Sequence, residues 1–260
     1  MGKVVVITGA SSGIGKTTAE MLNSKGYKIY NLSRRESDGI EHIKTDISDY
    51  EEVKRAIAYI FEKEGRIDIL INNAGMGISG AIENTDNSTA EQLFSVNFMG
   101  MFYVTKEVIP IMRKNKSGSI INISSAAAKF PLPFQAFYSA SKAAVSSFSD
   151  ALRLEVKPFG IKVTSILPGD VKTEFTQSRI KNKSNDPIYG NRIDKSVSAM
   201  ERDEENGMPP EAISKLIIKI LGKKNPPPYV IGGVKYAFLV FLIRLMPYRL
   251  TLFLIGKIYG

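Results

Sequence analysis

Apolar and polar residues alternate between two kinds of segment along the first two thirds of the chain. Short apolar runs that stop at glycine, proline or polar residues are typical of buried strands in a parallel sheet. Such runs lie at 4–7, 27–32, 41–44, 67–71, 119–123 and 161–167. Longer stretches with helical spacing separate them, at 16–25, 49–63, 90–114 and 138–156. The alternation predicts a single α/β domain with a doubly wound parallel sheet.

The amino-acid composition limits the chemistry that the chain can perform. The 260 residues include no cysteine and one histidine, His42. Disulfides and thiolate metal sites are therefore excluded, as are histidine metal clusters and serine–histidine–aspartate triads. We expect no metal site, and any general acid or base has to be a tyrosine, lysine, aspartate or glutamate.

The charge is strongly basic, with a formal net value of +9. Such a balance suits acidic lipid, a phosphorylated ligand or nucleic acid. The basic residues are dispersed and not interleaved with aromatic residues, so we expect no nucleic-acid partner. The chain opens on a strand pattern at Lys3 without a charged and then apolar leader, which favours a cytoplasmic, unprocessed protein.

Tyr138 and Lys142 form the pair with the clearest chemical meaning. Four residues advance a helix by little more than one turn, so the two side chains share one face. A free phenol titrates near pH ~10 and is a poor proton donor at neutral pH. A neighbouring ammonium stabilises the phenolate and lowers the pKa. An isolated pair at this spacing is more often a solvated surface pair, so its role depends on the other motifs.

A glycine-rich turn, residues 8–15, links the first predicted strand to the first predicted helix. Glycines let the backbone approach a pyrophosphate, and the helix N-terminus supplies free N–H groups and a positive dipole. The adjoining Gly15-Lys16-Thr17 is similar to the end of an ATP-binding P-loop. That motif requires glycine at position 10, which is alanine here, so an ATPase is not favoured.

The end of the second predicted strand carries Ser33, Arg34 and Arg35. A dinucleotide fold that prefers NAD places an acid here to hold the ribose 2′-hydroxyl. Residues 31–35 contain no acid, and a guanidinium matches the geometry of a phosphate. This favours NADP(H), whereas the simpler interpretation is two solvated loop arginines.

Asn97 interrupts an apolar helical run, and a buried asparagine needs hydrogen-bond partners. It is either a structural residue that distorts the helix or part of a site.

An aromatic and proline-rich loop at 126–137 leads directly to Tyr138. Farther along the chain, Pro168-Gly169 stops the sixth predicted strand. The special residues thus gather at the carboxyl ends of strands, where open parallel sheets bind ligands.

Together these motifs resemble the short-chain dehydrogenase/reductase family, in its form of about 250 residues. The resemblance is close over residues 1–175. It rests on the turn Thr8-Gly9 with Gly13 and Gly15, on Asn72-Asn73-Ala74-Gly75, on Asn97, and on Tyr138 with Lys142. Ser125, thirteen residues before Tyr138, has the family spacing and is preferred to Ser124; Pro168-Gly169 with Thr173 completes the pattern.

The resemblance implies a Rossmann-type fold and roles for particular residues. Tyr138 would exchange the proton, Ser125 would hydrogen-bond the reacting oxygen, Lys142 would hold the nicotinamide ribose, and Asn97 would hold a water that links Lys142 to solvent. The residues expected to bind NADP(H) are Gly9, Ser11, Ser12, Gly13, Ile14, Gly15, Ser33, Arg34, Arg35, Asp46, Ile47, Asn73, Ala74, Gly75, Tyr138, Lys142, Pro168, Gly169, Val171 and Thr173.

The remaining third of the chain divides into two segments by composition. Residues 174–210 are polar and loop-prone, which predicts either a substrate lid, as the resemblance implies, or a disordered surface insertion. We assign 1–233 to the catalytic domain and 234–260 to an apolar helical extension. Arg244, Pro247 and Arg249 interrupt that extension, so two helices are favoured over a membrane span. It would lie on a membrane surface, wall an apolar substrate pocket or contact a second subunit.

The expected function is NADP(H)-dependent interconversion of a secondary alcohol and a ketone. The aromatic loop and apolar extension favour a bulky hydrophobic substrate: a steroid, a retinoid-like compound or an acyl-lipid. Two alternatives remain, a 3-oxoacyl-carrier-protein reductase of fatty-acid synthesis and a non-catalytic NADP-sensing binding protein. The resemblance also implies a homodimer or homotetramer, formed through helices near 100–114 and 139–156, in the cytoplasm or peripherally on a membrane.

Overall fold

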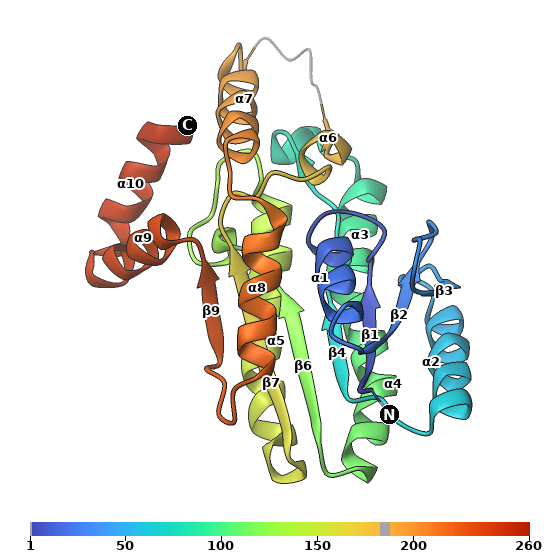
Figure 1. Ribbon diagram of the computed structural model, residues 1–260. Helices are drawn as coiled ribbons and strands as arrows, with labels where there is room; N and C mark the ends of the chain where they lie inside the picture. The colour runs from blue at the N-terminus through green and yellow to red at the C-terminus, as the bar shows by residue number, and fades with distance from the viewer. Residues whose placement is uncertain (1, 183–187) are drawn as a thin grey trace.

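The central element of the molecule is a parallel sheet. The computed structural model describes residues 2–182 and 188–260, and within these ranges seven strands pair in the order β3-β2-β1-β4-β6-β7-β9 (Figure 1). Each of these pairings is parallel. The strands are β1 (Val4–Thr8), β2 (Lys28–Ser33), β3 (Glu41–Lys44), β4 (Ile69–Asn72), β6 (Gly118–Ile123), β7 (Ile161–Pro168) and β9 (Tyr229–Gly232). The predicted Rossmann-type, doubly wound fold is confirmed.

Helices cover both faces of the sheet. The α-helices of the described residues are α1 (Gly13–Asn23), α2 (Tyr50–Glu64), α3 (Asn87–Phe94), α4 (Met101–Lys114), α5 (Ala136–Val156), α6 (Phe175–Ser178), α7 (Arg192–Glu205), α8 (Pro210–Leu221), α9 (Val234–Leu245) and α10 (Tyr248–Tyr259). The helices α1 and α8 lie on one face and α2, α4 and α5 on the other (Figure 1). A second, two-stranded parallel sheet joins β5 (Ile78–Ser79) to β8 (Ile180–Lys181).

The strand β1 shows why both layers are needed. Successive side chains of a strand point to opposite faces. Val4 and Val6 pack with the α2, α4 and α5 layer, whereas Val5 and Ile7 pack with α1 and α8. All four are almost fully buried, which matches the uninterrupted apolar run in the sequence. Because β1 lies at the point where the strand order reverses, this buried core fixes the position of the glycine-rich turn.

The long helix predicted at 90–114 contains a π-helical segment. It starts at Asn87, runs through α3, passes through a π-helical stretch at Ser95–Gly100 and continues as α4. Asn97 lies within the stretch and is buried. A π-helical turn inserts an extra residue and is often found at functional sites. The helix is therefore locally widened at the asparagine that the sequence marks as unusual.

The sequence pattern missed the last strand of the sheet. The apolar runs of the sequence predict no strand after residue 167. In the structure β9 pairs with β7, with Ile166 opposite Val230. Four residues after three prolines are too short a run to show strand periodicity, so only the open edge of β7 identifies them as a strand.

The two helices predicted around Pro247 are present as α9 and α10. They stand beyond the β9 edge of the sheet, and the end of α10 lies near α7 (Figure 1). Within the described residues, each helix is too short or too polar to cross a bilayer. The segment 174–210 contains α6, β8 and α7, while 183–187 lie outside the described residues.

Candidate active site

A cavity of about 650 Å³ opens at the carboxyl ends of the parallel strands. Residues that directly follow β1, β2, β3, β4, β6 and β7 line it. The expected cofactor residues among them are Gly9, Ser11, Ser12, Gly13, Ile14, Ser33, Arg34, Arg35, Asp46, Ile47, Asn73, Ala74, Gly75, Pro168, Gly169, Val171 and Thr173. Ser125, Tyr138 and Lys142 line the same cavity. The structure therefore brings both groups of predicted residues together.

The glycine-rich turn has the backbone geometry of a phosphate cradle. Gly9 and Gly13 have positive φ angles of 68° and 53°, which side chains other than glycine rarely adopt. A Cβ atom at Gly13 would lie 3.2 Å from the side chain of Thr173, which follows β7. The turn therefore leaves its backbone open to the cavity, as close contact with a pyrophosphate requires.

Hydrogen bonds from Asn73 hold this turn against β4. Its side-chain amide donates to the carbonyl oxygens of Thr8 (3.1 Å) and Gly9 (3.0 Å). In return, the Thr8 hydroxyl accepts from the backbone N–H groups of Asn73 and Ala74, both at 3.0 Å. Asn73 thus ties the end of β4 to the end of β1, at the point where the strand order reverses.

Two predicted residues, Gly15 and Asn97, do not line the cavity. A Cβ atom at Gly15 would collide with the side chain of Asn73 and the carbonyl oxygen of Gly9, so this glycine permits close packing of α1. Asn97 donates to the carbonyl oxygen of Met76 (3.0 Å) and accepts from its N–H group (2.8 Å). It braces the loop after β4, behind Gly75.

Arg34 and Arg35 lie at the far end of the cavity and are exposed to solvent. Arg35 donates to the Ser12 hydroxyl at 3.2 Å and is 3.9 Å from a Glu174 carboxylate oxygen. Although burial acts to raise the pKa of Asp46, hydrogen bonds from Ser48 and the charge of Arg34 hold it below its usual value. This end of the cavity therefore combines two exposed cations with an ionised acid.

The Tyr138 phenol, the Ser125 hydroxyl and the Lys142 ammonium occupy the opposite part of the cavity. The Ser125 hydroxyl accepts from the Ala127 N–H at 3.1 Å and lies near enough to the phenol to lower the pKa of Tyr138. Lys142 is 4% exposed, and its Nζ donates to the carbonyl oxygen of Ile123 at 3.0 Å. Ser124, the alternative serine, is turned away, because its hydroxyl donates to the carbonyl oxygen of Lys142 at 2.8 Å. The geometry supports the choice of Ser125.

Burial dominates the titration of this group. It raises the pKa of Tyr138 to about 12, against a smaller lowering by the Ser125 hydroxyl. Burial also lowers the pKa of Lys142 to about 8. From the sequence we expect Lys142 to lower the pKa of Tyr138. In the structure Nζ lies 5.9 Å from the centre of the tyrosine ring, and loss of hydration is the largest influence on the phenol, so its pKa is raised instead.

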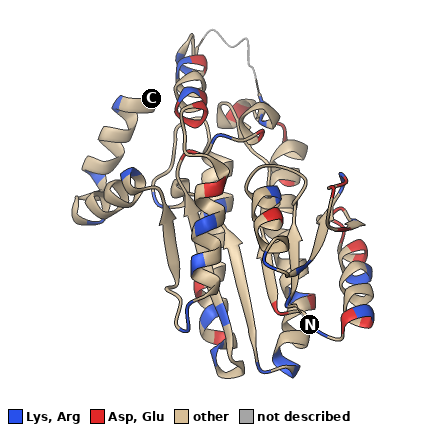
Figure 2. Ribbon diagram, viewed as in Figure 1, with Lys and Arg blue, Asp and Glu red and all other residues tan. Residues whose placement is uncertain are grey.

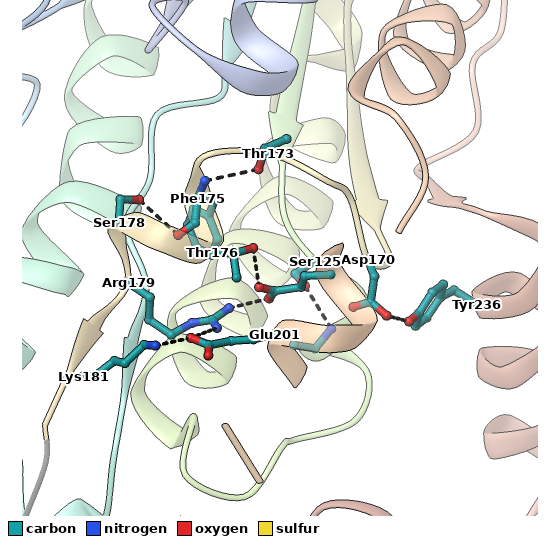
Figure 3. A network of polar contacts seen from close by, with 12 residues as sticks. Ser125, Asp170, Thr173, Phe175, Thr176, Ser178, Arg179, Lys181, Glu201 and Tyr236 are labelled. Atoms are coloured by element: carbon teal, nitrogen blue, oxygen red, sulfur yellow. Dashed lines mark hydrogen bonds and ion pairs between the residues drawn. The ribbon is translucent and has the colours of Figure 1, made fainter. Parts of the chain in front are cut away.

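The other wall of the cavity comes from the segments after β7. Figure 3 shows Asp170 and Tyr236 facing each other, and the Tyr236 hydroxyl donates a hydrogen bond to the Asp170 carboxylate. Tyr259 donates to Asp203 at 3.1 Å. All four residues line the cavity. The C-terminal helices therefore contribute directly to its wall.

A network of ion pairs around buried Arg179 joins α6 and residues 179–181 to α7 (Figure 3). Arg179 pairs with Glu204 and lies 4.0 Å from Glu201. Thr176 donates to Glu204 at 2.6 Å, and Lys181 pairs with Glu201 at 2.6 Å. These contacts fix Phe175 and neighbouring residues on the cavity, with the Phe175 ring 5.7 Å from the Tyr138 ring.

The sequence of residues 3–184 matches the family described as short chain dehydrogenase. This match covers most of the chain and includes the glycine-rich turn, Asn97, Ser125, Tyr138 and Lys142. The chain belongs to the short-chain dehydrogenase family. It is therefore an oxidoreductase whose family binds NAD(H) or NADP(H). The family membership that the motifs predicted is confirmed.

One relative of this short-chain dehydrogenase is the 3-ketodihydrosphingosine reductase of Bacteroides thetaiotaomicron. The two are 42% identical over an alignment of 232 residues, and the alignment covers 86% of each chain. A solved short-chain dehydrogenase from Streptomyces avermitilis has a TM-score of 0.86 and 30% identity, covering 99% of this chain and 97% of the other. The similarity to it extends through the C-terminal helices.

Solved neighbours with bound cofactor hold different dinucleotides. ElxO with NADP bound has a TM-score of 0.74 and 26% identity, covering 90% of this chain and 98% of the other. A 3-ketoacyl-(acyl-carrier-protein) reductase from Brucella melitensis, complexed with NADH, has a TM-score of 0.73 and 25% identity, covering 89% and 98%. The family likeness therefore leaves the choice between NAD(H) and NADP(H) to the residues of this chain.

Several residues that line the cavity of this short-chain dehydrogenase were not among those predicted from the sequence. They are Asp170, Phe175, Asp203, Tyr236 and Tyr259. Asp170 carried a weak signal, as a carboxylate inside the Pro168–Thr173 segment. The two tyrosines carried another, as hydroxyl-bearing residues near the two ends of an apolar extension. Only the fold brings these distant positions to one wall.

Proposed function

We propose that the protein is an NADP(H)-dependent ketone reductase for a bulky hydrophobic substrate. The observation that carries this proposal is the convergence of Ser125, Tyr138 and buried Lys142 on one cavity that has two arginines at its far end. Tyr138 and Lys142 are one turn apart on α5. This arrangement suits transfer of a proton to a carbonyl oxygen. The four retained residues Asn97, Ser125, Tyr138 and Lys142 argue against a protein that only senses the nucleotide.

The residues of the cavity fit a nicotinamide dinucleotide. Gly9 and Gly13 expose backbone to the cavity, and Thr173 closes the turn from the β7 side. Arg34 and Arg35 stand where a 2′-phosphate on the adenine ribose would lie, and Asp46 stands beside them. Residues 31–35 contain no acid that could accept a hydrogen bond from the ribose 2′-hydroxyl of NAD(H). This favours NADP(H) over NAD(H).

When bound, the cofactor supplies a hydride to the carbonyl carbon. Tyr138 donates its proton to the carbonyl oxygen as negative charge develops there. Ser125 donates a hydrogen bond to the same oxygen and orients it toward the phenol. Lys142 places a positive charge beside the phenolate that remains, and its contact with the Ile123 carbonyl oxygen fixes its position. Burial keeps Tyr138 protonated at neutral pH, which is the state from which it donates a proton.

The wall of the cavity supports a long-chain lipid ketone among the bulky substrates. Phe130, Leu132, Phe175, Met200 and Tyr236 supply apolar and aromatic surface. The relative from Bacteroides thetaiotaomicron is named for 3-ketodihydrosphingosine, a long-chain ketone with an amine next to its carbonyl group. Steroid and retinoid-like ketones remain weaker candidates, since only the apolar wall favours them.

The carboxylate of Asp170 adds support for an amine on the substrate. It lines the cavity beside Gly169, and burial with the nearby charges of Asp203 and Glu204 raises its pKa to about 6. The group is therefore ionised at neutral pH. Glu204 is already paired with Arg179. Asp170 and Asp203 make the substrate part of the cavity negative, which complements an ammonium group.

A substrate panel tests the proposed function. We expect NADPH oxidation with 3-ketodihydrosphingosine, and slow or no oxidation with sugars. The panel includes a steroid ketone, a retinoid-like ketone and a 3-oxoacyl thioester, whose preference would indicate the fatty-acid reductase instead. Failure to oxidise NADPH or NADH with every ketone, by protein that binds the cofactor, would exclude a reductase and favour the sensing protein.

The assembly and location are part of the same proposal. We place the enzyme in the cytoplasm as a homodimer or homotetramer built through α4 and α5, with 174–210 as the substrate lid. Exposed Leu154 on α5 supports a contact there. Analytical ultracentrifugation of Leu154→Glu, compared with the unchanged chain, tests the interface; an unchanged mass would exclude it.

A further inference from the structure

The C-terminal helices α9 and α10 have two faces with different surroundings. On the inner face, Val240 and Ile255 are each 8% exposed and pack with Ala126 and Phe130 beneath the cavity. Tyr236 reaches the cavity wall from α9 and Tyr259 from α10. The inner face therefore belongs to the substrate site and is already covered by protein.

The outer face is unusually apolar for a surface. Among the described residues, 17 large hydrophobic side chains are exposed, and 11 of them lie between 234 and 258. Phe238, Phe241 and Phe253 are 61%, 58% and 57% exposed. A tenth of the chain thus carries most of its exposed apolar side chains. Contiguous apolar surface of this kind marks a place where a protein meets another molecule or a lipid phase.

The charged side chains of these two helices have one sign. Residues 234–260 contain Lys235, Arg244, Arg249 and Lys257, and no aspartate or glutamate. All four are exposed, and none forms an ion pair with a carboxylate of the described residues. Figure 2 shows this region as tan ribbon with blue segments only. Apolar and basic side chains without acids complement the headgroup layer of an anionic bilayer.

A second copy of the chain fits this face poorly. Docking of one outer face on another would bring two sets of four cations together without a carboxylate on either surface, and like charges repel. A bilayer crossing is also excluded, because twelve residues of helix extend about 18 Å, whereas the hydrocarbon core is about 30 Å thick. Pro247 separates the helices, so they form a bent, shallow surface.

We propose that the outer face of α9 and α10 docks on an anionic phospholipid bilayer and holds the substrate cavity at the lipid surface. The same two helices form the cavity wall through Tyr236 and Tyr259, so a lipid ketone needs to travel only past these helices to reach Tyr138. This delivery of substrate rests on the proposed function, whereas the docking itself does not.

Vesicle co-sedimentation of the full chain tests the docking. We expect binding to phosphatidylcholine vesicles with a quarter of phosphatidylglycerol, and at least tenfold weaker binding to pure phosphatidylcholine. The triple variant Phe238→Ser, Phe241→Ser and Phe253→Ser should lose at least tenfold. Tyr59→Ser, which removes an exposed aromatic residue on α2, should bind as the unchanged chain does.

A charge-matched pair of variants separates headgroup attraction from net charge. Arg244→Glu with Arg249→Glu lowers the net charge as much as Lys54→Glu with Arg55→Glu on α2. We expect at least tenfold weaker binding for the first pair and little change for the second. Equal loss for both pairs, or no binding of the unchanged chain to anionic vesicles, would overturn the proposal. A fall in oligomer mass for the serine variant, without loss of vesicle binding, would assign the face to a second copy.

Activity then separates docking from catalysis. The serine variant should reduce a short, water-soluble ketone as fast as the unchanged chain, but a long-chain ketone in vesicles at least fivefold more slowly. Equal rates on vesicle substrate would exclude delivery from the bilayer. Absence of reduction by the unchanged chain on every ketone would contradict the proposed function and leave the vesicle-binding result standing. Circular dichroism and thermal melting confirm that each variant is folded.

Discussion

The Tyr236 hydroxyl of α9 donates a hydrogen bond to the carboxylate of Asp170, two residues after Pro168 at the end of β7. This contact joins the C-terminal extension to the segment expected to clasp the nicotinamide. A substitution in the extension can therefore affect the substrate part of the cavity without touching Tyr138. The extension is structurally part of the catalytic unit, although the sequence separates it from the family motifs.

Replacement of Asp170 tests the amine preference. Asp170→Asn keeps a hydrogen-bond acceptor for Tyr236 but removes the charge, so the KM for 3-ketodihydrosphingosine should rise at least tenfold. The KM for its N-acetyl form, which lacks the ammonium, should change little. Since the pKa of Asp170 is raised to about 6, attraction for the amine should be complete above pH 7 and weaken as pH falls through 6. An equal effect on both substrates would contradict the role of the charge.

Removal of the Tyr138 hydroxyl tests the proton donor. Tyr138→Phe should lower the rate constant of reduction by about 10²–10⁴-fold, the contribution usual for general acid catalysis. Cofactor affinity should stay nearly unchanged, as measured by quenching or energy transfer in NADPH fluorescence. The ring remains in contact with Phe175, so folding should be retained. A rate near that of the unchanged enzyme would exclude Tyr138 as the donor.

Arg34 tests the choice of cofactor. Arg34→Ala should raise the Kd for NADPH by about 10–100-fold, the range for loss of a charged hydrogen bond. The Kd for NADH should change less than threefold, because NADH lacks the 2′-phosphate. Lys44→Ala is the control variant, because it removes a cation at the end of neighbouring β3, outside this cavity. Equal weakening of both cofactors would reject contact with the 2′-phosphate.

The pH profile tests Lys142. Burial lowers its pKa to about 8, so the ammonium is present at pH 7 and is lost as pH rises through 8. Tyr138 keeps its proton over this range, because its own pKa is about 12. We therefore expect kcat/KM for reduction to fall with a midpoint near pH 8. Lys142→Arg, which stays charged, should remove this step even if its overall rate is lower; persistence of the step would assign it to another group.

The sequence predicted the cofactor half of the site more fully than the substrate half. The glycine-rich turn, Asn73, Ser125, Tyr138 and Lys142 lie within short motifs whose spacing carries their geometry. The position of Asn97 behind the cavity was not predictable, because it depends on a π-helical turn and on the loop backbone at Met76. The direction of the Tyr138 pKa was also mistaken, since burial is a property of the assembled cavity.

The sequence by itself determined the alternation of strands and helices, the residues at the strand ends and the break at Pro247. These are local features, because the spacing of apolar residues and the backbone preferences of glycine and proline fix the conformation of neighbouring residues. The tertiary structure alone decided that β9 completes the sheet, that Asp170 meets Tyr236, and that one face of α9 and α10 lines the cavity while the other meets solvent. Those relationships join residues that are far apart in the chain, and only packing of the whole core fixes them.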